Sequence, residues 1–436
     1  MSHVLLVQGN ARRMPLADKS VSMVCTSPPY WGLRSYGIGG AHGEIGTEAT
    51  HDCLGWATGE RCETCYICVM VTVFQEVKRI LHPTGTLWIN IGDSYANDGK
   101  WGGATGGKHV QALHGQAIGR AKRKTGLKPK DLCGIPQRLA LALQADGWYW
   151  RSEIVWSKTC PMPESVKDRP TRSHEQVLLF SKQERYFWDS DAVRQAYSAS
   201  GLNDALHQYR YGRKVNSKHA QLVATGIHGG DWFDDPSVTR DAFYQRGGAN
   251  LRTVWQITPE CSSVPHFAVF PTELVRRCVL AGTSEHGVCS GCRAPWRREV
   301  ERQRLLDGQP FETEAFSRHD EPYRIKPNGI GHARYSTRRH DHGWLPTCDC
   351  DAPLAAAVVF DPFVGSGTTV HVACALGRDG VGTDLSYPYL RDIAQPRIAP
   401  TFAQPGLFEP RSNGVVHAGL PQQTTLFGES LGKESR

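Results

Sequence analysis

Short apolar runs and one amphipathic stripe dominate the first half of the chain, and similar patterns recur near its end. Segments rich in apolar residues predict strands over 86–92, 148–156, 177–180 and 355–360, after a strand, turn and strand within residues 1–35. Apolar residues at helical spacing predict a helix over 71–81, and further helices are expected over 135–145 and from residue 370. Because strands that alternate with helices favour a parallel sheet, the pattern predicts an α/β fold.

Composition narrows the class of protein. The chain has 436 residues, 40% of them hydrophobic, which is enough for a large core and two or three domains. No apolar run reaches the roughly 20 residues that span a bilayer, and the first residues lack a long apolar segment, so we expect a cytoplasmic protein. The fourteen cysteines are then expected to be reduced thiols or metal ligands. A net charge of +7 permits nucleic-acid binding without requiring it.

The stretch TSPPYW, residues 26–31, follows an apolar run. Its two prolines stiffen the chain where the predicted strand ends. Because Pro29 supplies no N–H, the Ser27 side chain and the Pro28 carbonyl stay available as hydrogen-bond acceptors beside an aromatic ring. Taken alone, the stretch fits an ordinary strand-ending turn equally well.

A second stretch, DPFVGSGTT at 361–369, joins an apolar run to a predicted helix. A strand, a glycine-rich turn and a helix together bring backbone N–H groups close to a nucleotide-like ligand. Asp384 ends the next apolar stretch, where a carboxylate can accept both hydroxyls of a ribose. A glycine-rich turn alone is more often a tight connection, but acidic residues before and after this one strengthen the prediction of a ligand site.

The two motifs, in this order, resemble the beta class of S-adenosylmethionine-dependent DNA methyltransferases that modify amino groups. In that family a catalytic (Asp/Ser/Asn)-Pro-Pro-(Tyr/Phe/Trp) motif comes first, then a recognition region, then a Phe-x-Gly-x-Gly cofactor motif. Family-like sequences also occur at 85–95, 150–158 and 266–284. The resemblance spans most of residues 1–395 and implies a doubly wound, mostly parallel, Rossmann-like methyltransferase sheet.

The resemblance implies how the first motif acts. The Ser27 side chain and the Pro28 carbonyl, fixed by Pro29, would accept hydrogen bonds from the exocyclic amine of a base flipped out of double-stranded DNA. Such acceptors favour a pyramidal nitrogen, whose lone pair is a better nucleophile than one delocalised into the ring. Tyr30 would stack on the flipped base, and Trp31 would extend the stacking surface.

The resemblance also implies how the methyl donor is held. The methyl group would move in line from sulfur to nitrogen without a covalent enzyme intermediate, so Cys25 need not be a nucleophile. Asn10 stands where the family often has Asp, and it can still hydrogen-bond an adenine amine. The residues implied to bind S-adenosylmethionine are Asn10, Phe270, Pro271, Asp361, Phe363, Gly365, Ser366, Gly367, Thr368 and Asp384.

The choice of target base depends on one residue. Family members with Ser at the first motif position often modify cytosine N4, whereas Asp is usual in adenine N6 enzymes. Ser27 therefore favours cytosine N4, with adenine N6 as the alternative. Two rivals remain: a methyltransferase acting on RNA or protein, and an inactive zinc-containing DNA-binding protein. The intact motifs argue against the second rival.

The order of the motifs divides the chain into parts. We expect residues 1–190 to form the catalytic half of the methyltransferase domain and residues 251–395 the cofactor-binding half. The remaining predicted parts are a Cys-rich insert at 37–68, a basic loop at 97–130, a target-recognition region at 191–250, a zinc-knuckle insert at 283–351 and a flexible tail at 396–436.

Two groups of cysteines have metal-ligand spacing. The first holds a CxxC and a CxC pair far apart in the chain and predicts a tetrahedral zinc site that stabilises an insert. The second is a CxxCxxC run preceded by one more cysteine, and it predicts either zinc, with His51 as a substitute ligand, or an iron–sulfur cluster. Unligated thiols are the alternative for both. The groups are Cys289, Cys292, Cys348 and Cys350, and Cys53, Cys62, Cys65 and Cys68.

Further segments bear on partners. Within a DNA enzyme the run Lys122, Arg123 and Lys124 would contact phosphates, although such a run is more often a solvated loop. Two tail peptides, Gln404–Phe408 and Gln423–Phe427, resemble the Gln-x-x-Leu-Phe peptide that binds bacterial sliding clamps, although short patterns also arise by chance. A cognate restriction endonuclease is a further candidate partner, and the resemblance implies a bacterial, archaeal or phage origin.

Overall fold

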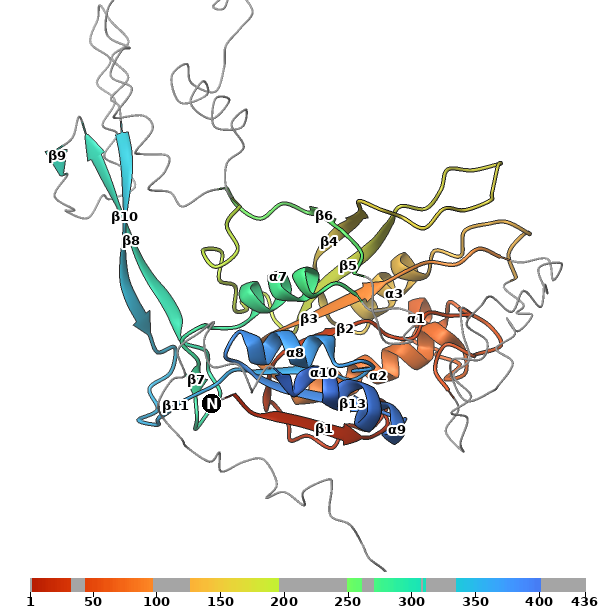
Figure 1. The fold of residues 1–436 in the computed structure, drawn as a ribbon, viewed down its shortest axis with the longest axis horizontal. Helices are drawn as coiled ribbons and strands as arrows, with labels where there is room; N and C mark the ends of the chain where they lie inside the picture. Colours follow the sequence, from red (N-terminus) through yellow and green to blue (C-terminus); the bar gives the residue numbers. More distant parts are fainter. Residues whose placement is uncertain are drawn as a thin grey trace, which may run out of the picture. The chain divides into compact units, whose positions relative to one another are not determined.

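The computed structural model describes residues 2–32, 44–96, 126–195, 249–260, 270–306, 309–310 and 335–400. Contacts divide the chain into two compact units (Figure 1). Among the described helices, none combines the length and apolar character needed to cross a membrane. The first unit consists of Met1–Asp189, Arg252–Arg297 and Pro346–Arg436, and the second of Ser190–Leu251 and Arg298–Leu345.

An eight-stranded sheet forms the centre of the first unit, in the order β1-β13-β12-β2-β3-β5-β4-β6. β5 is antiparallel to both neighbours, and every other neighbouring pair is parallel, so the predicted mostly parallel sheet is confirmed. The strands are β1 (Val4–Gln8), β2 (Val21–Thr26), β3 (Leu81–Ile91), β4 (Tyr149–Lys158), β5 (His174–Ser181), β6 (Val254–Ile257), β12 (Val358–Asp361) and β13 (Asp379–Asp384).

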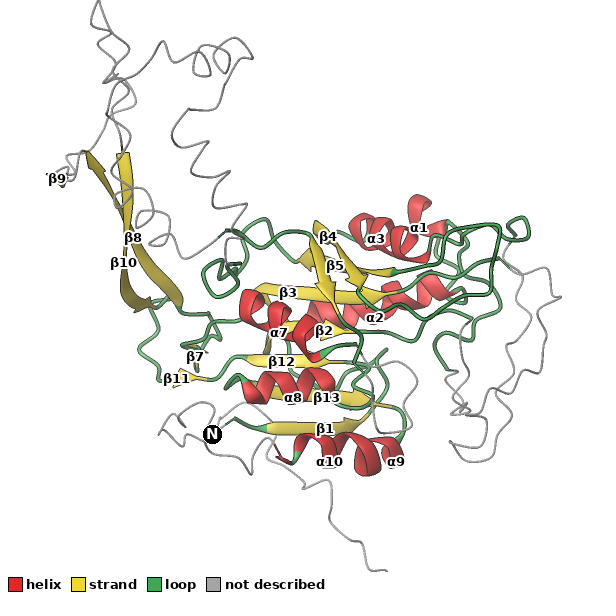
Figure 2. Ribbon diagram, turned by 45° about the horizontal axis from the view of Figure 1, so that its top comes forward, coloured by secondary structure: helices red, strands yellow, loops and turns green. Residues whose placement is uncertain are grey.

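Helices cover both faces of the sheet (Figures 1 and 2). Because side chains of a strand alternate between faces, Val24 and Leu87 pack into the core beneath α2, whereas Met23 and Trp88 lie against Gly282 of α7. The fold is therefore doubly wound, as predicted. The helical elements are α1 (Gly55–Thr58), α2 (Tyr66–Ile80), α3 (Ile135–Ala145), α7 (Thr272–Gly282), α8 (Thr368–Ala375), α9 (Tyr387–Tyr389), the π-helix η1 (Leu390–Ala394) and α10 (Gln395–Ile398).

Element boundaries follow the predictions with two corrections. The helix over 135–145 coincides with α3, but α2 spans Tyr66–Ile80 rather than 71–81. It starts earlier because the Cys65 side chain accepts a hydrogen bond from the Cys68 N–H and caps the first turn. The apolar run 355–360 is also interrupted, since residues 354–355 form the separate strand β11 and β12 begins at Val358.

Charged strands in the insert had no counterpart in the predictions. β8 (Arg297–Leu306), β9 (Gln309–Pro310) and β10 (Tyr335–Leu345) form a three-stranded sheet. The β8 sequence RREVERQRLL lacks the apolar alternation that indicates a half-buried strand, which explains the omission. In the first unit, β7 (Val288–Cys289) pairs with β11 (Leu354–Ala355) in an antiparallel two-stranded sheet.

Candidate catalytic and cofactor site

The two predicted motifs leave neighbouring strands of the sheet. β2 and β12 run parallel, with Val24 opposite Phe360, so the loops that follow them emerge at the same edge. A hydrogen bond of 2.6 Å joins the Thr26 hydroxyl to Asp361 Oδ1 across 335 positions of sequence. The structure therefore brings the Ser27–Tyr30 loop and the glycine-rich turn together, although they are remote in the chain.

Asp361 connects the two loops. Its side chain is buried, and its Oδ1 also accepts the Phe363 N–H at 3.0 Å. Its Oδ2 accepts the Thr369 hydroxyl at 2.8 Å, and that hydroxyl lies 3.1 Å from the Cys25 carbonyl. Burial raises the pKa of Asp361 to about 6, and the hydrogen bonds oppose that rise. This carboxylate fixes the end of β2, the glycine-rich turn and the start of α8 relative to one another.

Tyr30 is oriented by polar groups on neighbouring strands. Its hydroxyl donates to Glu175 Oε2 at 2.7 Å and accepts from Asn90 Nδ2 at 2.9 Å. Glu175 Oε1 also pairs with Lys158 Nζ at 2.5 Å, which holds the carboxylate in place. Burial, and then the Glu175 charge, raise the pKa of Tyr30 well above its ordinary value, while a hydrogen bond with Ser27 lowers it. The phenol therefore stays neutral, and its ring is fixed at the loop.

Two neighbouring carbonyl groups of the Ser27–Tyr30 loop differ in their hydrogen bonding. The Tyr66 hydroxyl donates to the Pro29 carbonyl at 2.8 Å. Among the residues that the structure describes, none donates a hydrogen bond to the Pro28 carbonyl. A Cβ at Gly92 would lie 2.7 Å from Tyr30 Cε2, so glycine gives the ring its place at the end of β3. The loop thus presents Pro28 as an acceptor beside Ser27.

Trp31 does not extend a stacking surface, contrary to the prediction. Its side chain is 3% exposed and belongs to the core beneath α2. Its Nε1 donates to the Glu48 carbonyl at 3.0 Å, and its ring lies 5.2 Å from that of His51. Because the indole is large and mostly apolar, its burial in the core stabilises the fold more than its exposure at the surface would.

Asp384 is at the centre of the predicted cofactor residues. Its Oδ2 accepts the Gly365 N–H at 3.2 Å, its Oδ1 accepts the Ser386 N–H at 2.9 Å, and its carbonyl accepts the Gly9 N–H at 2.9 Å. Burial raises the pKa of its carboxyl group. Asn10 follows Gly9, and its side-chain oxygen accepts the Arg12 N–H at 2.9 Å. The ends of β1, β12 and β13 therefore bring three predicted cofactor residues, Asn10, Gly365 and Asp384, to one place.

The glycine-rich turn is held by an arginine that the sequence did not indicate. Arg397 Nη1 donates to the Ser366 hydroxyl at 2.7 Å and to the Thr368 hydroxyl at 2.9 Å. Gly365 and Gly367 have φ of 49° and 82°, the left-handed region that favours glycine. Arg397 lies in α10, far beyond the motif, and no pattern connects it to the turn in the sequence.

Two other predicted cofactor residues lie at the start of α7. Phe270 is buried, and Pro271 is the residue before the first helical position. Glu260 caps this end of α7, because its Oε1 accepts the Thr272 N–H at 2.8 Å. The Glu260 charge acts on His371 of α8 and on Arg397, so this end of α7 is near the helix that follows the glycine-rich turn.

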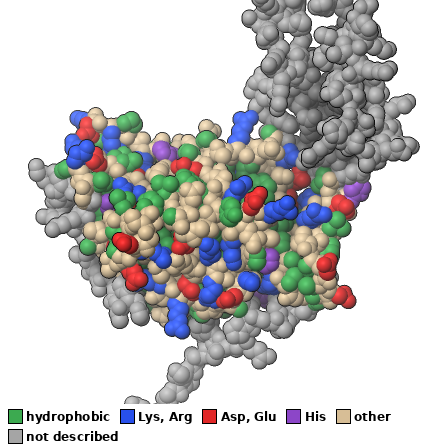
Figure 3. Space-filling model, turned by 180° about the vertical axis from the view of Figure 1, so that it is seen from behind, with side chains coloured by type: hydrophobic (Ala, Val, Ile, Leu, Met, Phe, Trp, Pro, Cys, Tyr) green, Lys and Arg blue, Asp and Glu red, His purple; other side chains and the backbone are tan. Residues whose placement is uncertain are grey.

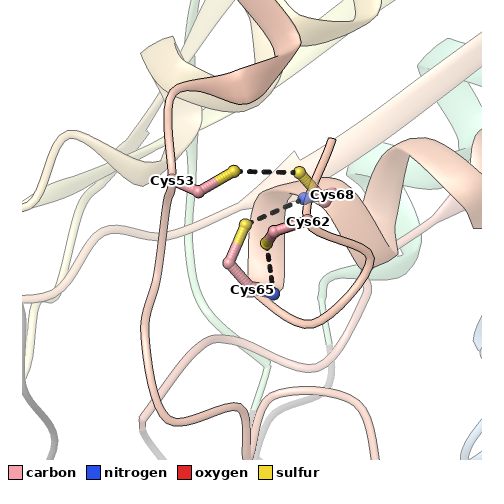
Figure 4. Close-up of side chains that lie close together, drawn as sticks. All are labelled: Cys53, Cys62, Cys65 and Cys68. Carbon is pink, nitrogen blue, oxygen red and sulfur yellow. Dashed lines mark hydrogen bonds between the residues drawn. The ribbon is translucent and has the colours of Figure 1, made fainter. Parts of the chain in front are cut away.

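Both cysteine groups come together in space. In each group the four sulfur atoms lie within 4.8 Å of one another, so each could hold a zinc ion as a tetrahedral Cys₄ site. His51 is not part of either group. The group at 53–68 lies at the first turn of α2 (Figure 4). The other lies where the chain leaves the first unit after Arg297 and returns to it at Pro346.

Several predicted contacts lie outside the described residues. These include Lys122, Arg123 and Lys124, most of the recognition region 191–250 and both tail peptides. On the face in Figure 3, Lys and Arg side chains are interspersed with Asp and Glu. This face gives no further indication of where phosphates would bind.

Comparison with known proteins agrees with the site. A family model described as DNA methylase, for N6 and N4 methyltransferases, matches residues 21–290 and 355–395. The chain is 39% identical over 282 residues to the type II methyltransferase M.Cfr9I of Citrobacter freundii, covering 64% of this chain and 72% of the relative. It is 29% identical over 412 residues to M.SfiI of Streptomyces fimbriatus, covering 86% of each. A solved structure of PvuII DNA methyltransferase (cytosine-N4-specific) matches 92% of each chain at 13% identity, with a TM-score of 0.44.

The match to the family includes the Ser27–Tyr30 loop, the glycine-rich turn and Asp384. The chain belongs to the DNA methylase family of N6 and N4 methyltransferases. It is an S-adenosylmethionine-dependent DNA methyltransferase, and the predicted family is confirmed.

Proposed function

We propose that the enzyme methylates the N4 amine of cytosine in double-stranded DNA. The observation that carries the proposal is the pair of acceptors at the end of β2. The Pro28 carbonyl receives no hydrogen bond from the described residues, and Ser27 precedes it in the chain. Two acceptors that engage the two N–H bonds of an exocyclic amine orient its nitrogen lone pair toward a donor on the opposite side.

The base would be held by the ring of Tyr30. The hydroxyl of Tyr30 is tied to Glu175 and Asn90, so its ring is rigid before a base arrives. A preorganised aromatic ring stacks on a flipped base without a further ordering cost. Tyr30 would therefore set the plane in which the cytosine lies.

S-adenosylmethionine would occupy the adjacent edge formed by β12, β13 and β1. Asp384 would accept the ribose hydroxyls with its remaining lone pairs, and the turn 363–368 would face the methionine part. Phe270, Pro271 and Asn10 would complete this site. Asp361 then acts by holding the donor side and the base side in register, since both of its oxygens are occupied by protein donors.

The chemical step needs no covalent intermediate with the protein. The bond between the methyl carbon and the sulfonium sulfur breaks as the bond to the amine nitrogen forms, which yields S-adenosylhomocysteine. The nitrogen loses one proton to water. Cys25 does not take part, because it is buried, and its hydrogen bond with Cys278 and burial raise the pKa of its thiol well above the ordinary value.

Further parts of the proposal concern partners. The recognition region 191–250 would read the DNA sequence, and Lys122, Arg123 and Lys124 would contact phosphates. M.Cfr9I and M.SfiI are type II methyltransferases of bacteria, which supports a cognate restriction endonuclease and a cytoplasmic place of action. The tail peptides Gln404–Phe408 and Gln423–Phe427 would be tested for clamp binding by Leu426→Ala.

The experiment is transfer of a labelled methyl group from S-adenosylmethionine to DNA, RNA and protein offered separately. We expect label only in double-stranded DNA. Label in RNA or protein but not in DNA would contradict the proposal, and nucleoside analysis of the DNA would show whether cytosine N4 or adenine N6 carries the methyl group.

A further inference from the structure

The cysteine group at 53–68 surrounds the first turn of α2 (Figure 4). Four thiolates bound to one zinc ion at about 2.3 Å each are separated by about 3.8 Å in tetrahedral geometry. The four sulfur atoms lie within 4.8 Å of one another, and the Sγ atoms of Cys53 and Cys68 are 3.4 Å apart. A disulfide requires about 2 Å. An iron–sulfur cluster places several metal and sulfide atoms between its thiolates, so it needs a wider group than a single ion does.

Backbone amides point at three of these sulfur atoms. Cys62 Sγ accepts the Cys65 N–H at 3.2 Å, and Cys65 Sγ accepts the Cys68 N–H at 3.5 Å. Cys53 Sγ accepts the Gly55 N–H at 3.3 Å. Such outer hydrogen bonds orient the ligand sulfur atoms of a metal site. The spacing of the sulfur atoms and the N–H groups directed at them therefore fit a metal site.

The same turn of α2 contacts the catalytic loop directly. Tyr66 follows the metal-ligand candidate Cys65 in the chain and is completely buried. Its hydroxyl donates to the Pro29 carbonyl at 2.8 Å. Since Pro29 lies between the proposed acceptor Pro28 and the stacking residue Tyr30, any shift of the first turn of α2 is passed to both.

A second connection runs through the segment 44–52. The carbonyls of Thr50 and His51 accept the first two N–H groups of α2, at 3.1 Å and 3.0 Å. The Glu48 carbonyl accepts the Trp31 indole N–H at 3.0 Å. One side of this short segment is therefore attached to the start of α2, and the other to the residue that follows the catalytic loop.

We propose that Cys53, Cys62, Cys65 and Cys68 bind one Zn²⁺, and that the ion holds the catalytic loop in its reactive position through Tyr66 and the segment 44–52. The ion contacts neither base nor methyl donor, and Tyr66 is a positioning residue. Zinc binding does not depend on the proposed function. The positioning role rests on the proposed role of Ser27–Tyr30.

The first test is metal content, measured by elemental mass spectrometry on the full chain. Cys62→Ser should lose one equivalent of zinc relative to wild type, while Cys160→Ser, an exposed cysteine outside both groups, should lose none. Iron in place of zinc, or equal zinc content in Cys62→Ser and wild type, would overturn the site. This readout needs no methyl transfer, so it is independent of the substrate.

The second test separates the metal from its effect on the loop. Tyr66→Phe should keep the zinc content and the S-adenosylmethionine affinity of wild type, yet lower the single-turnover rate of methyl transfer about 2- to 10-fold, the range that one hydrogen bond supports. Cys62→Ser should lower the rate further, with cofactor affinity within about 3-fold. Because Tyr66→Phe removes only one hydrogen bond, its transfer rate should fall less than that of Cys62→Ser.

A chelator titration of wild-type protein covers the case in which Cys62→Ser does not fold. Zinc released from the 53–68 group should parallel the loss of transfer rate, while bound S-adenosylmethionine is retained. An unchanged rate in Tyr66→Phe, or an unchanged rate after that zinc has been removed, would overturn the positioning role.

Discussion

The proposed base side and the proposed cofactor side of the site are held by different kinds of contact. On the base side, Tyr66, Asn90 and Glu175 reach in from other elements and hold the residues next to the acceptors. On the cofactor side, two carboxylates and one arginine hold the turn, namely Asp361, Asp384 and Arg397. On the base side, the loss of an acceptor or of the aromatic ring should lower the transfer rate or the DNA affinity. On the cofactor side, the loss of a carboxylate should lower the S-adenosylmethionine affinity, and pH should change the stability.

The largest effect should come from Ser27→Ala, which removes one proposed acceptor for the amine. Loss of a preorganised group that acts on the reacting atom costs about 10²- to 10³-fold in rate. We expect that loss in the single-turnover rate, with S-adenosylmethionine affinity within about 2-fold. Ser20→Ala, before the start of β2, is the control. A rate for Ser27→Ala near that of wild type would remove the distinction between the two sides.

Substitution of Tyr30 should separate ring stacking from the hydroxyl network. Tyr30→Ala removes a stacking contribution of about 1–3 kcal/mol, so DNA affinity should fall about 5- to 150-fold. Tyr30→Phe keeps the ring, and Glu175 still pairs with Lys158 and Asn90, so the loss should stay below about 5-fold. Titration of DNA with each variant measures the two affinities. An equal loss of DNA affinity in Tyr30→Ala and Tyr30→Phe would show that the hydroxyl rather than the ring contributes to binding.

Asp384→Ala tests the cofactor side. The variant loses a charged acceptor for the ribose and the bond to Gly365, so the dissociation constant for S-adenosylmethionine should rise about 10- to 100-fold. The rate at saturating cofactor should change less than about 3-fold. Calorimetry and a kinetic titration measure the two quantities. A fall in the saturated rate with unchanged cofactor affinity would place Asp384 on the base side instead.

The smallest effect concerns pH and Asp361. Its pKa is about 6 in the folded protein, above the ordinary value of 3.8, so the folded chain binds more protons than the unfolded chain between these values. Stability therefore falls as pH rises through this window, by about 1 kcal/mol between pH 5 and pH 7. Asp361→Asn can still bond Thr26 and Thr369 and should remove this pH dependence. Urea unfolding at both pH values measures it.

Asp361→Ala is the contrasting variant for the same residue. It leaves the Thr26 hydroxyl and the Phe363 N–H without the acceptor that Asp361 provides, whereas the Thr369 hydroxyl keeps the Cys25 carbonyl. Each unsatisfied buried group costs about 1–3 kcal/mol, so the variant should be less stable than Asp361→Asn at every pH. Equal stability of the two variants would mean that the connection between the loops contributes little.

Local motifs were predictable because their shape is encoded in neighbouring residues. The Pro-Pro turn and the glycine-rich turn have restricted backbone conformations, and apolar periodicity placed α3 and the central strands. The residues that hold these turns were not predictable. Glu175 lies 145 positions from Tyr30, and no sequence pattern connects the two.

Two predictions from the sequence are wrong because they depend on tertiary packing. Trp31 is predicted to extend the stacking surface of Tyr30, but it is buried and its indole N–H donates to the Glu48 carbonyl of the segment 44–52. The start of α2 was placed too late, because the thiol of Cys65 rather than a hydroxyl or carboxylate caps the helix. Neither contact is visible in residue spacing, because the partners come together only in the folded chain.

Mass spectrometry of nucleosides from DNA treated with the purified enzyme and S-adenosylmethionine tests the central claim most directly. We predict N4-methylcytosine, because two acceptors orient an exocyclic amine beside the methyl donor and Ser27, rather than Asp, stands first in the motif. N6-methyladenine would contradict the choice of base. 5-Methylcytosine would contradict the mechanism itself, because a carbon target does not use acceptors for an amine.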